Sequence, residues 1–440
     1  MGFSARFGGL ILLLAVVPTL EAAWKAGVAR LDITPQEPIW MSGYAARTKP
    51  SAGVLHPLWA KALAIDDGRG GRAVIVTTDL IGLPRAITDA VSARAAKAWG
   101  LERSQIVFNS SHTHTGPIVR HSLVNIANIP ASEMPAIERY GDRLTEQLEQ
   151  VIAAALGKLE AATVSYHESK ATFAINRRSF PVKPVDHTVP TLKVTAADGR
   201  LMAAVFGYAC HNTTLTAQFH ELSGDYAGFA QIEFEKAHPG AVGLFMLLAA
   251  ADQNPNPRSE LRLAQEHGAA LAGAVSEAIR KPGTAVNGRL RTAFQLTDLP
   301  FAPRERADFE AELKDTNQFK VRRAEMMIAA MDARRAVTKV AYPVQAVRFG
   351  STVTLLALGG ELVMDYNLQI KAAFPKEKLI VAGYSNDVMC YIPTRRILNE
   401  GGYEANDSMI YFGQPGPFAP EVEDLVMNSM KRVLARVGVK

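Results

Sequence analysis

The chain has 440 residues, of which 48% are hydrophobic, and its 48 basic and 43 acidic residues give a formal net charge of +5. This composition excludes an intrinsically disordered chain, and without any Lys- or Arg-rich run a nucleic-acid partner is not expected. Two Cys are too few for a disulfide scaffold. The 33 Gly are scattered through the chain, which excludes a collagen-like repeat.

The N-terminal segment, residues 1–23, is typical of a secretory signal peptide. Arg6 supplies a positive charge, residues 10–17 form a short apolar core, and the small residues Ala22 and Ala23 follow. The apolar core is too short to span a bilayer, and an uncleaved N-terminal anchor is the alternative. We therefore expect an exported protein, secreted or periplasmic, whose basic character would favour a peripheral contact with an anionic membrane surface.

Apolar strands and amphipathic helices alternate through the first half of the remaining chain. The patterns predict strands over residues 26–34, 58–65, 73–78, 105–109, 191–194 and 203–208. They predict helices over residues 85–99, 132–158 and 226–238. A turn sequence at residues 197–199 predicts that the last two of these strands form a hairpin.

The second half continues the alternation. Strands are predicted over residues 243–250, 289–296, 345–349, 352–358 and 379–383. Helices are predicted over residues 260–280, 361–374 and 420–437, with one or two more within 304–338. Alternating strands and helices with inserted hairpins predict an α/β fold with a mixed β-sheet core and flanking helices. Because no flexible linker divides the sequence, we expect a single large domain of catalytic type over residues 24–440.

Histidines follow two of the predicted strands. His112 and His114 come after the strand at 105–109, and in an extended chain residues two apart face the same side. Such a pair suits Zn²⁺, although two polar loop histidines are the alternative. His211 follows the strand at 203–208, and a third histidine at a strand end strengthens the metal-site interpretation.

Three further polar segments follow strands. Asp225 is expected to cap the helix at 226–238 rather than to bind a metal. The Asn-Pro-rich segment around Asn254 is either the lip of a cavity or a plain loop. Glu361 is predicted at the start of a helix, where its negative charge would interact favourably with the helix dipole. From this position its carboxylate could also reach a metal.

Taken in order, these segments resemble the neutral (non-lysosomal) ceramidase family. The most specific motif is Ser-His-Thr-His-Thr-Gly-Pro at residues 111–117, and the opening Ala-Gly-Val-Ala-Arg-Leu-Asp-Ile-Thr-Pro at residues 26–35 is also similar to that family. The resemblance extends in order from about residue 26 to residue 437. It implies one Zn²⁺ ion per chain, bound by two His, one Glu and one Tyr: His112, His211, Glu361 and Tyr391. It further implies catalytic or substrate-facing roles for His114, Arg177 and Tyr403.

The sequence departs from the family in two respects. Asn254 stands where the family has an essential serine, so a serine nucleophile is impossible at that position, and Asn254 is expected to hydrogen-bond a bound amide instead. The family also carries an immunoglobulin-like C-terminal domain, which we do not expect here. Both departures leave open whether ceramide is the substrate.

The resulting hypothesis is an exported zinc-dependent hydrolase that cleaves the amide bond of an N-acylated, ceramide-like or related substrate through a metal-activated water. One alternative is a catalytically silent family member that binds a lipid or a glycan. A second is a metal-dependent phosphoesterase, which would favour several Asp ligands and two metals. Cys210 and Cys390 each adjoin a proposed ligand, and the sequence leaves open whether they form a disulfide.

Overall fold

The computed structural model describes residues 2, 24–120, 122–123 and 129–440. Apart from Gly2, the predicted signal peptide at residues 1–23 lies outside the described residues. Among the helices of the described ranges, none is long and apolar enough to cross a membrane.

The larger of two main sheets is mixed. Its strands β4 and β5 are parallel, as are β9 and β11, whereas the other pairs are antiparallel. The predicted hairpin joins β8 to β9, with a register shift at Val194–Thr195. The spatial order is β11 (Val242–Leu247), β9 (Leu201–Tyr208), β8 (Thr188–Ala196), β6 (Glu160–Lys170), β1 (Trp24–Asp32), β3 (Trp59–Asp66), β4 (Arg72–Thr78) and β5 (Ile106–Ser110), with β13 (Thr284–Val286) beside β6.

The second main sheet has the order β14 (Leu290–Pro300), β15 (Lys339–Phe349), β16 (Val353–Leu358) and β18 (Lys378–Ala382). Its first three strands are antiparallel, and β18 joins β16 in parallel. Three two-stranded pairs complete the strands of the described part: β2 (Gly53–Val54) with β10 (Glu221–Leu222), β7 (Ala174–Asn176) with β12 (Gln253–Pro255), and β17 (Glu361–Leu362) with β19 (Tyr391–Ile392).

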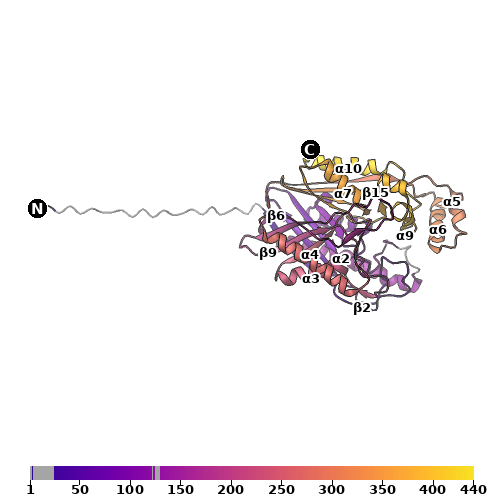
Figure 1. The fold of residues 1–440 in the computed structure, drawn as a ribbon, viewed down its shortest axis with the longest axis horizontal. Helices are drawn as coiled ribbons and strands as arrows, with labels where there is room; N and C mark the ends of the chain where they lie inside the picture. The colour runs from indigo at the N-terminus through magenta and orange to yellow at the C-terminus, as the bar shows by residue number, and fades with distance from the viewer. Residues whose placement is uncertain (1, 3–23, 121, 124–128) are drawn as a thin grey trace.

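The helices follow the predicted ranges closely in most places. The segment predicted to hold one or two helices at 304–338 contains two, α5 and α6, which lie together at one end of the molecule (Figure 1). The α-helices are α1 (Arg85–Trp99), α2 (Met134–Leu156), α3 (Asp225–Ala237), α4 (Leu261–Arg280), α5 (Arg306–Glu312), α6 (Gln318–Asp332), α7 (Met364–Ala373), α8 (Arg395–Glu400), α9 (Met409–Phe412) and α10 (Val422–Arg436). Short 3₁₀ turns occur at Arg103–Gln105 and Ala131–Glu133, and one π-helical turn at Tyr403–Asp407.

The elements form four layers: helices, the larger sheet, the second sheet and further helices. Successive side chains of a strand point to opposite faces of its sheet, so each strand can pack against a layer on both sides. In β3, Ala60, Ala62 and Ala64 face α1 and α2, whereas Leu63 and Ile65 face the second sheet. The helices α3 and α4 cover the same outer face of the larger sheet farther along, over β9 and β11. On the other side of the molecule, α7 and α10 pack on the outer face of the second sheet (Figure 1). The expected α/β fold with a mixed sheet core and flanking helices is confirmed.

Candidate metal centre

Strand ends from both sheets meet at one buried side chain. β5 and β11 lie at opposite ends of the strand order of the larger sheet, yet Asn109 near the end of β5 binds both backbone groups of Leu247 on β11. Its Nδ2 donates to the Leu247 carbonyl at 3.1 Å, and its Oδ1 accepts from the Leu247 N–H at 2.8 Å. Nδ2 also donates to the carbonyl of Gly383, just after β18, at 2.8 Å. Asn109 thereby gathers three strand ends next to the loops that carry the predicted ligands.

His112 follows β5 in a left-handed conformation, with φ of 59°. The chain is therefore not extended here as expected, since the strand ends at Ser110, but His112 and His114 still face one space, as predicted. The turn is held by the His112 N–H, which donates to Leu80 O at 2.8 Å. The ring Nδ1 lies 2.5 Å from Ile81 O. A carbonyl oxygen only accepts, so Nδ1 carries a proton, and Nε2 faces the site.

His211 follows β9 and is oriented in the same way. Its backbone N–H donates to Gln253 O at 3.0 Å, and its ring Nδ1 lies 2.8 Å from Ala250 O. Nε2 is again left as an acceptor that faces the site. Burial, and then the nearby Arg177 guanidinium, lower the pKa of His211 to about 4, so this imidazole is neutral at pH 7.

Glu361 occupies the space between these two histidines. Its Oε2 lies 3.2 Å from His112 Nε2 and 3.1 Å from His211 Nε2. The placement of Glu361 at a helix start is wrong: it lies on β17, which pairs in parallel with β19, and α7 begins three residues later at Met364. The pairing puts Tyr391 directly opposite Glu361. The Tyr391 hydroxyl lies 3.4 Å from His211 Nε2.

The two imidazole nitrogens and the carboxylate oxygen are better placed to bind a divalent cation than to bond to one another. Two imidazole lone pairs and a carboxylate oxygen are all acceptors, and at separations of 3.1–3.2 Å they repel unless a proton or a cation lies between them. Atoms bound tetrahedrally at about 2.0–2.1 Å from one Zn²⁺ lie about 3.3 Å apart, close to the spacing found here.

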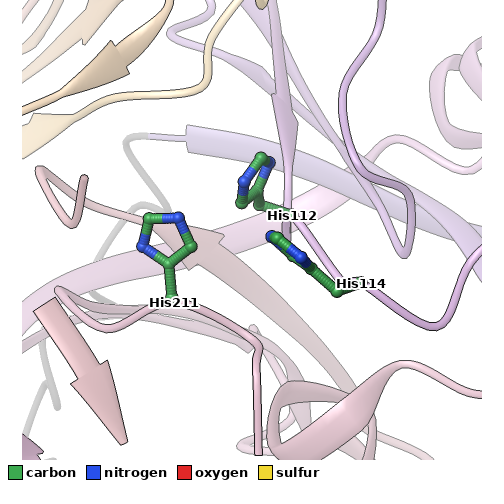
Figure 2. Close-up of side chains that lie close together, drawn as sticks. All are labelled: His112, His114 and His211. Atoms are coloured by element: carbon green, nitrogen blue, oxygen red, sulfur yellow. The ribbon is translucent and has the colours of Figure 1, made fainter. Parts of the chain in front are cut away.

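His114 completes a cluster of three histidines in which one ring nitrogen from each residue lies within 4.8 Å of the other two. Figure 2 shows the three rings around one small space, with His112 and His114 on one segment and His211 on another. Neither ring nitrogen of His114 has a hydrogen-bond partner among the described residues. Burial, followed by His112 and His211, lowers the pKa of His114 well below its usual value. The side chain also lines the adjoining cavity, with its ring 4.9 Å from that of Tyr44.

The structure brings the other predicted site residues to the rim of the same cavity. Each nitrogen of the Arg177 guanidinium donates to a side chain: Nη2 to the Tyr391 hydroxyl at 3.0 Å, Nη1 to Asn254 Oδ1 at 3.3 Å, and Nε to Glu404 Oε1 at 2.9 Å. Asn254 lies on the short strand β12. Tyr403 is 42% exposed and stacks its ring edge-on against Tyr391 at 5.4 Å.

Sequence reasoning missed three residues of the site. Glu404 is 3% exposed and binds both Arg177 and Arg178, and its Oε2 accepts from Arg178 Nη1 at 2.6 Å. Tyr384 donates to Glu361 Oε2 at 3.4 Å. Tyr44 lines the cavity. Glu404 is next to the predicted Tyr403 in the sequence, and Tyr384 lies in the turn after β18. Their positions in the sequence are the one signal that could have pointed to these residues.

One expectation from the sequence, the N-cap role of Asp225, is wrong, and one open question, the state of the two cysteines, is answered. Asp225 is not the N-cap but the first residue of α3, with φ of 53°; its carboxylate accepts from the N–H groups of Leu215 and Tyr226. Cys210 and Cys390 are both buried and free.

The family model of neutral/alkaline non-lysosomal ceramidases, N-terminal part, matches residues 24–256. The chain belongs to this family. The neutral ceramidase of Pseudomonas aeruginosa is 24% identical over 276 residues, which cover 58% of this chain and 40% of that protein. The neutral ceramidase of Drosophila melanogaster is 26% identical over 265 residues, or 54% and 37% of the two chains. The chain thus spans about two fifths of the length of these curated relatives.

Solved ceramidase structures share the fold. The crystal structure of the Pseudomonas aeruginosa neutral ceramidase superposes with a TM-score of 0.72 at 19% identity, covering 94% of this chain and 75% of that one. A structure described as ceramidase complexed with C2 gives a TM-score of 0.71 at 18% identity, with coverage of 94% and 76%. The likeness therefore extends beyond the matched region to the second sheet and its helices.

Proposed function

We propose that this chain is an exported, zinc-dependent amidohydrolase that cleaves the amide bond of an N-acylated, ceramide-like or related substrate. The observation that carries the proposal is the convergence of His112 Nε2 and His211 Nε2 on one Glu361 oxygen beside a cavity. Membership of the ceramidase family supports the reaction class. The signal-like segment at residues 1–23 supports export.

His112, His211, Glu361 and Tyr391 would hold the ion, which is the ligand set that the family resemblance implies. A zinc ion bound there would polarise the amide carbonyl and lower the pKa of a water molecule. Neutral imidazoles and a carboxylate are the ligand types that Zn²⁺ prefers, and the protonated Nδ1 atoms fix both rings.

The chain's own residues would perform the remaining steps. Asn254 carries an amide and cannot act as a nucleophile, so attack falls to water. His114 is neutral at pH 7 and has two ring nitrogens without partners among the described residues, so it can accept a proton from the attacking water and return it to the leaving nitrogen. Arg177 holds the Tyr391 hydroxyl at 3.0 Å and Asn254 at 3.3 Å, which fixes the cavity wall facing the substrate.

The first test is metal content. Purified wild-type protein, His112→Ala and His211→Ala are analysed by inductively coupled plasma mass spectrometry. His238→Ala is a matched control, because its ring lies 2.9 Å from Ser276 Oγ on α4 and takes no part in the cluster. We expect about one zinc per chain in the wild type and the control, and loss of zinc in the two site variants. Stoichiometric zinc in both site variants would remove the ligand assignment.

The second test is turnover of a panel of N-acyl amides, including ceramide, with release of the fatty acid as the readout. Asn254 in place of the family's serine favours one competing function, a silent member that binds a lipid without hydrolysing it. Amide hydrolysis that requires zinc supports the hydrolase. Zinc binding and amide affinity with no fatty-acid release would instead support the silent binder.

A further inference from the structure

The cavity beside the metal centre has an unbalanced charge. It has a volume of about 420 Å³, and its lining includes His114 and Tyr391 together with three arginines and a single carboxylate. The carboxylate is Glu404, whose two oxygens accept from Arg177 and Arg178 at 2.9 and 2.6 Å. Both oxygens of Glu404 are therefore bonded to the other two arginines, and Glu404 does not pair with the third, Arg258.

Within the described part of the chain, the Arg258 side chain has one hydrogen bond, from Nη2 to the Tyr44 hydroxyl at 3.3 Å. Among the described residues, no carboxylate forms an ion pair with it within 4.0 Å. The buried carboxylate of Asp225 interacts electrostatically with Arg258. Its two oxygens, however, accept hydrogen bonds from the N–H groups of Leu215 and Tyr226 at 2.9 and 2.5 Å. Most of the five N–H donors of Arg258 are thus available to whatever enters the cavity.

A second polar group in the same cavity is also without a partner. Thr213 follows the ligand His211 by two residues, is 3% exposed and lines the cavity. Its buried hydroxyl has no hydrogen-bond partner among the described residues. A buried hydroxyl without a partner is costly, so Thr213 and Arg258 together indicate a ligand with oxygen acceptors.

We propose that Arg258 binds a carboxylate of the substrate, so that the preferred substrates are N-acyl amino acids rather than neutral ceramides. This inference rests on the proposed amidohydrolase function and names its substrate class. A single guanidinium without a counter-ion matches a monoanion, and its planar fork suits the two oxygens of a carboxylate. Arg177 offers fewer donors than Arg258, because each of its three nitrogens already donates one hydrogen bond to a side chain of the protein and only two of its five N–H groups remain.

The test compares two substrates that differ only in this charge, N-lauroylglycine and N-lauroylglycinamide, with laurate release as the readout. We expect the wild type to favour the acid in kcat/KM by about tenfold or more, and Arg258→Gln to reduce that ratio about 10- to 100-fold. Arg258→Lys keeps the charge and should retain part of the preference. Arg262→Gln is the matched control, since this exposed arginine pairs with Glu260 and Glu266 at the start of α4. A wild-type ratio near one, or a ratio that Arg258→Gln leaves unchanged, would overturn the inference while leaving the amidohydrolase in place.

A binding measurement separates this inference from the proposed function. The panel of N-acyl amides decides the amidohydrolase proposal itself. If neither lauroyl compound is hydrolysed, calorimetry on the folded proteins still compares the dissociation constants of the acid and the amide. Tighter binding of N-lauroylglycine by about tenfold in the wild type, lost in Arg258→Gln but kept in Arg262→Gln, would support the carboxylate site. Equal dissociation constants for the two compounds would refute it.

Discussion

Replacing Asn109 with alanine tests whether one side chain joins the two edges of the larger sheet. Asn109 is fully buried and makes four hydrogen bonds: two with Leu247, one with Gly383 O and one with Ser385 Oγ. The substitution removes all four. Gly383 O keeps a donor, because Ser385 Oγ bonds it at 2.8 Å, whereas the buried N–H of Leu247 loses the acceptor that Asn109 provides.

The expected cost follows from these contacts. A buried polar group left without a partner costs about 1–3 kcal/mol, and two such losses at Leu247 give about 2–6 kcal/mol. This is a large part of the roughly 5–15 kcal/mol by which a typical domain is stable. Ser385→Ala removes one bond to Asn109 and the bond to Gly383 but leaves both bonds to Leu247, so we expect only about 1 kcal/mol for this control.

Urea unfolding followed by circular dichroism measures both variants. We expect the midpoint of Asn109→Ala to fall well below that of Ser385→Ala while the dependence on urea stays the same, because the surface exposed on unfolding does not change. If the two variants unfold at the same midpoint, the contacts with Leu247 contribute little, and Asn109 does not join the sheet edges.

Three further outcomes are expected. Metal removal by a chelator should lower the melting temperature in calorimetry, and zinc should restore it, since free zinc at about one hundred times its dissociation constant adds about 2.7 kcal/mol. Burial raises the pKa of Asp387 to about 7, so its carboxyl holds a proton in the folded state that the unfolded state releases near pH 4, and ionisation costs the folded state stability as the pH rises. The gain in unfolding free energy from Asp387→Asn should therefore increase by about 2.6 kcal/mol from pH 5 to pH 8, and a constant gain would contradict this pKa. Glu404→Gln leaves Arg177 and Arg178 without their shared carboxylate and should cost about 3–5 kcal/mol in urea unfolding, whereas Arg200→Gln, which breaks an exposed ion pair with Glu160, should cost less than about 1 kcal/mol.

Local patterns in the sequence predict elements whose stability is largely their own. The helix predicted at 85–99 has the bounds of α1, and Gly100 ends it in a left-handed conformation with φ of 65°. β6 escapes prediction because polar residues such as His167 and Glu168 interrupt its apolar pattern. Pairing with β1, β8 and β13 makes this segment a strand, and sequence periodicity does not report such pairing.

In the candidate site, too, local sequence indicates some features, whereas contacts between distant residues determine the others. Histidines at strand ends are visible in the sequence, but the left-handed turn at His112 depends on carbonyl oxygens at residues 80 and 81. The ion pair between Arg178 and Glu404 spans 226 residues of chain, and the contacts of Asn109 with Leu247 span 138. Glu361 was predicted on a helix because its local sequence favours a helix start, and the parallel pairing with Tyr391 overrides that preference.

The positions of the proposed ligands also imply that metal binding and folding are coupled. His112 and His211 follow strands of the larger sheet, whereas Glu361 follows the second sheet. In the absence of a cation, the Glu361 carboxylate faces an imidazole acceptor on each side within 3.2 Å, and this repulsion acts directly across the contact between the two sheets. A bound cation turns the repulsion into attraction. The strand ends that Asn109 gathers should therefore be the part of the molecule whose amide hydrogen exchange slows most when zinc is added.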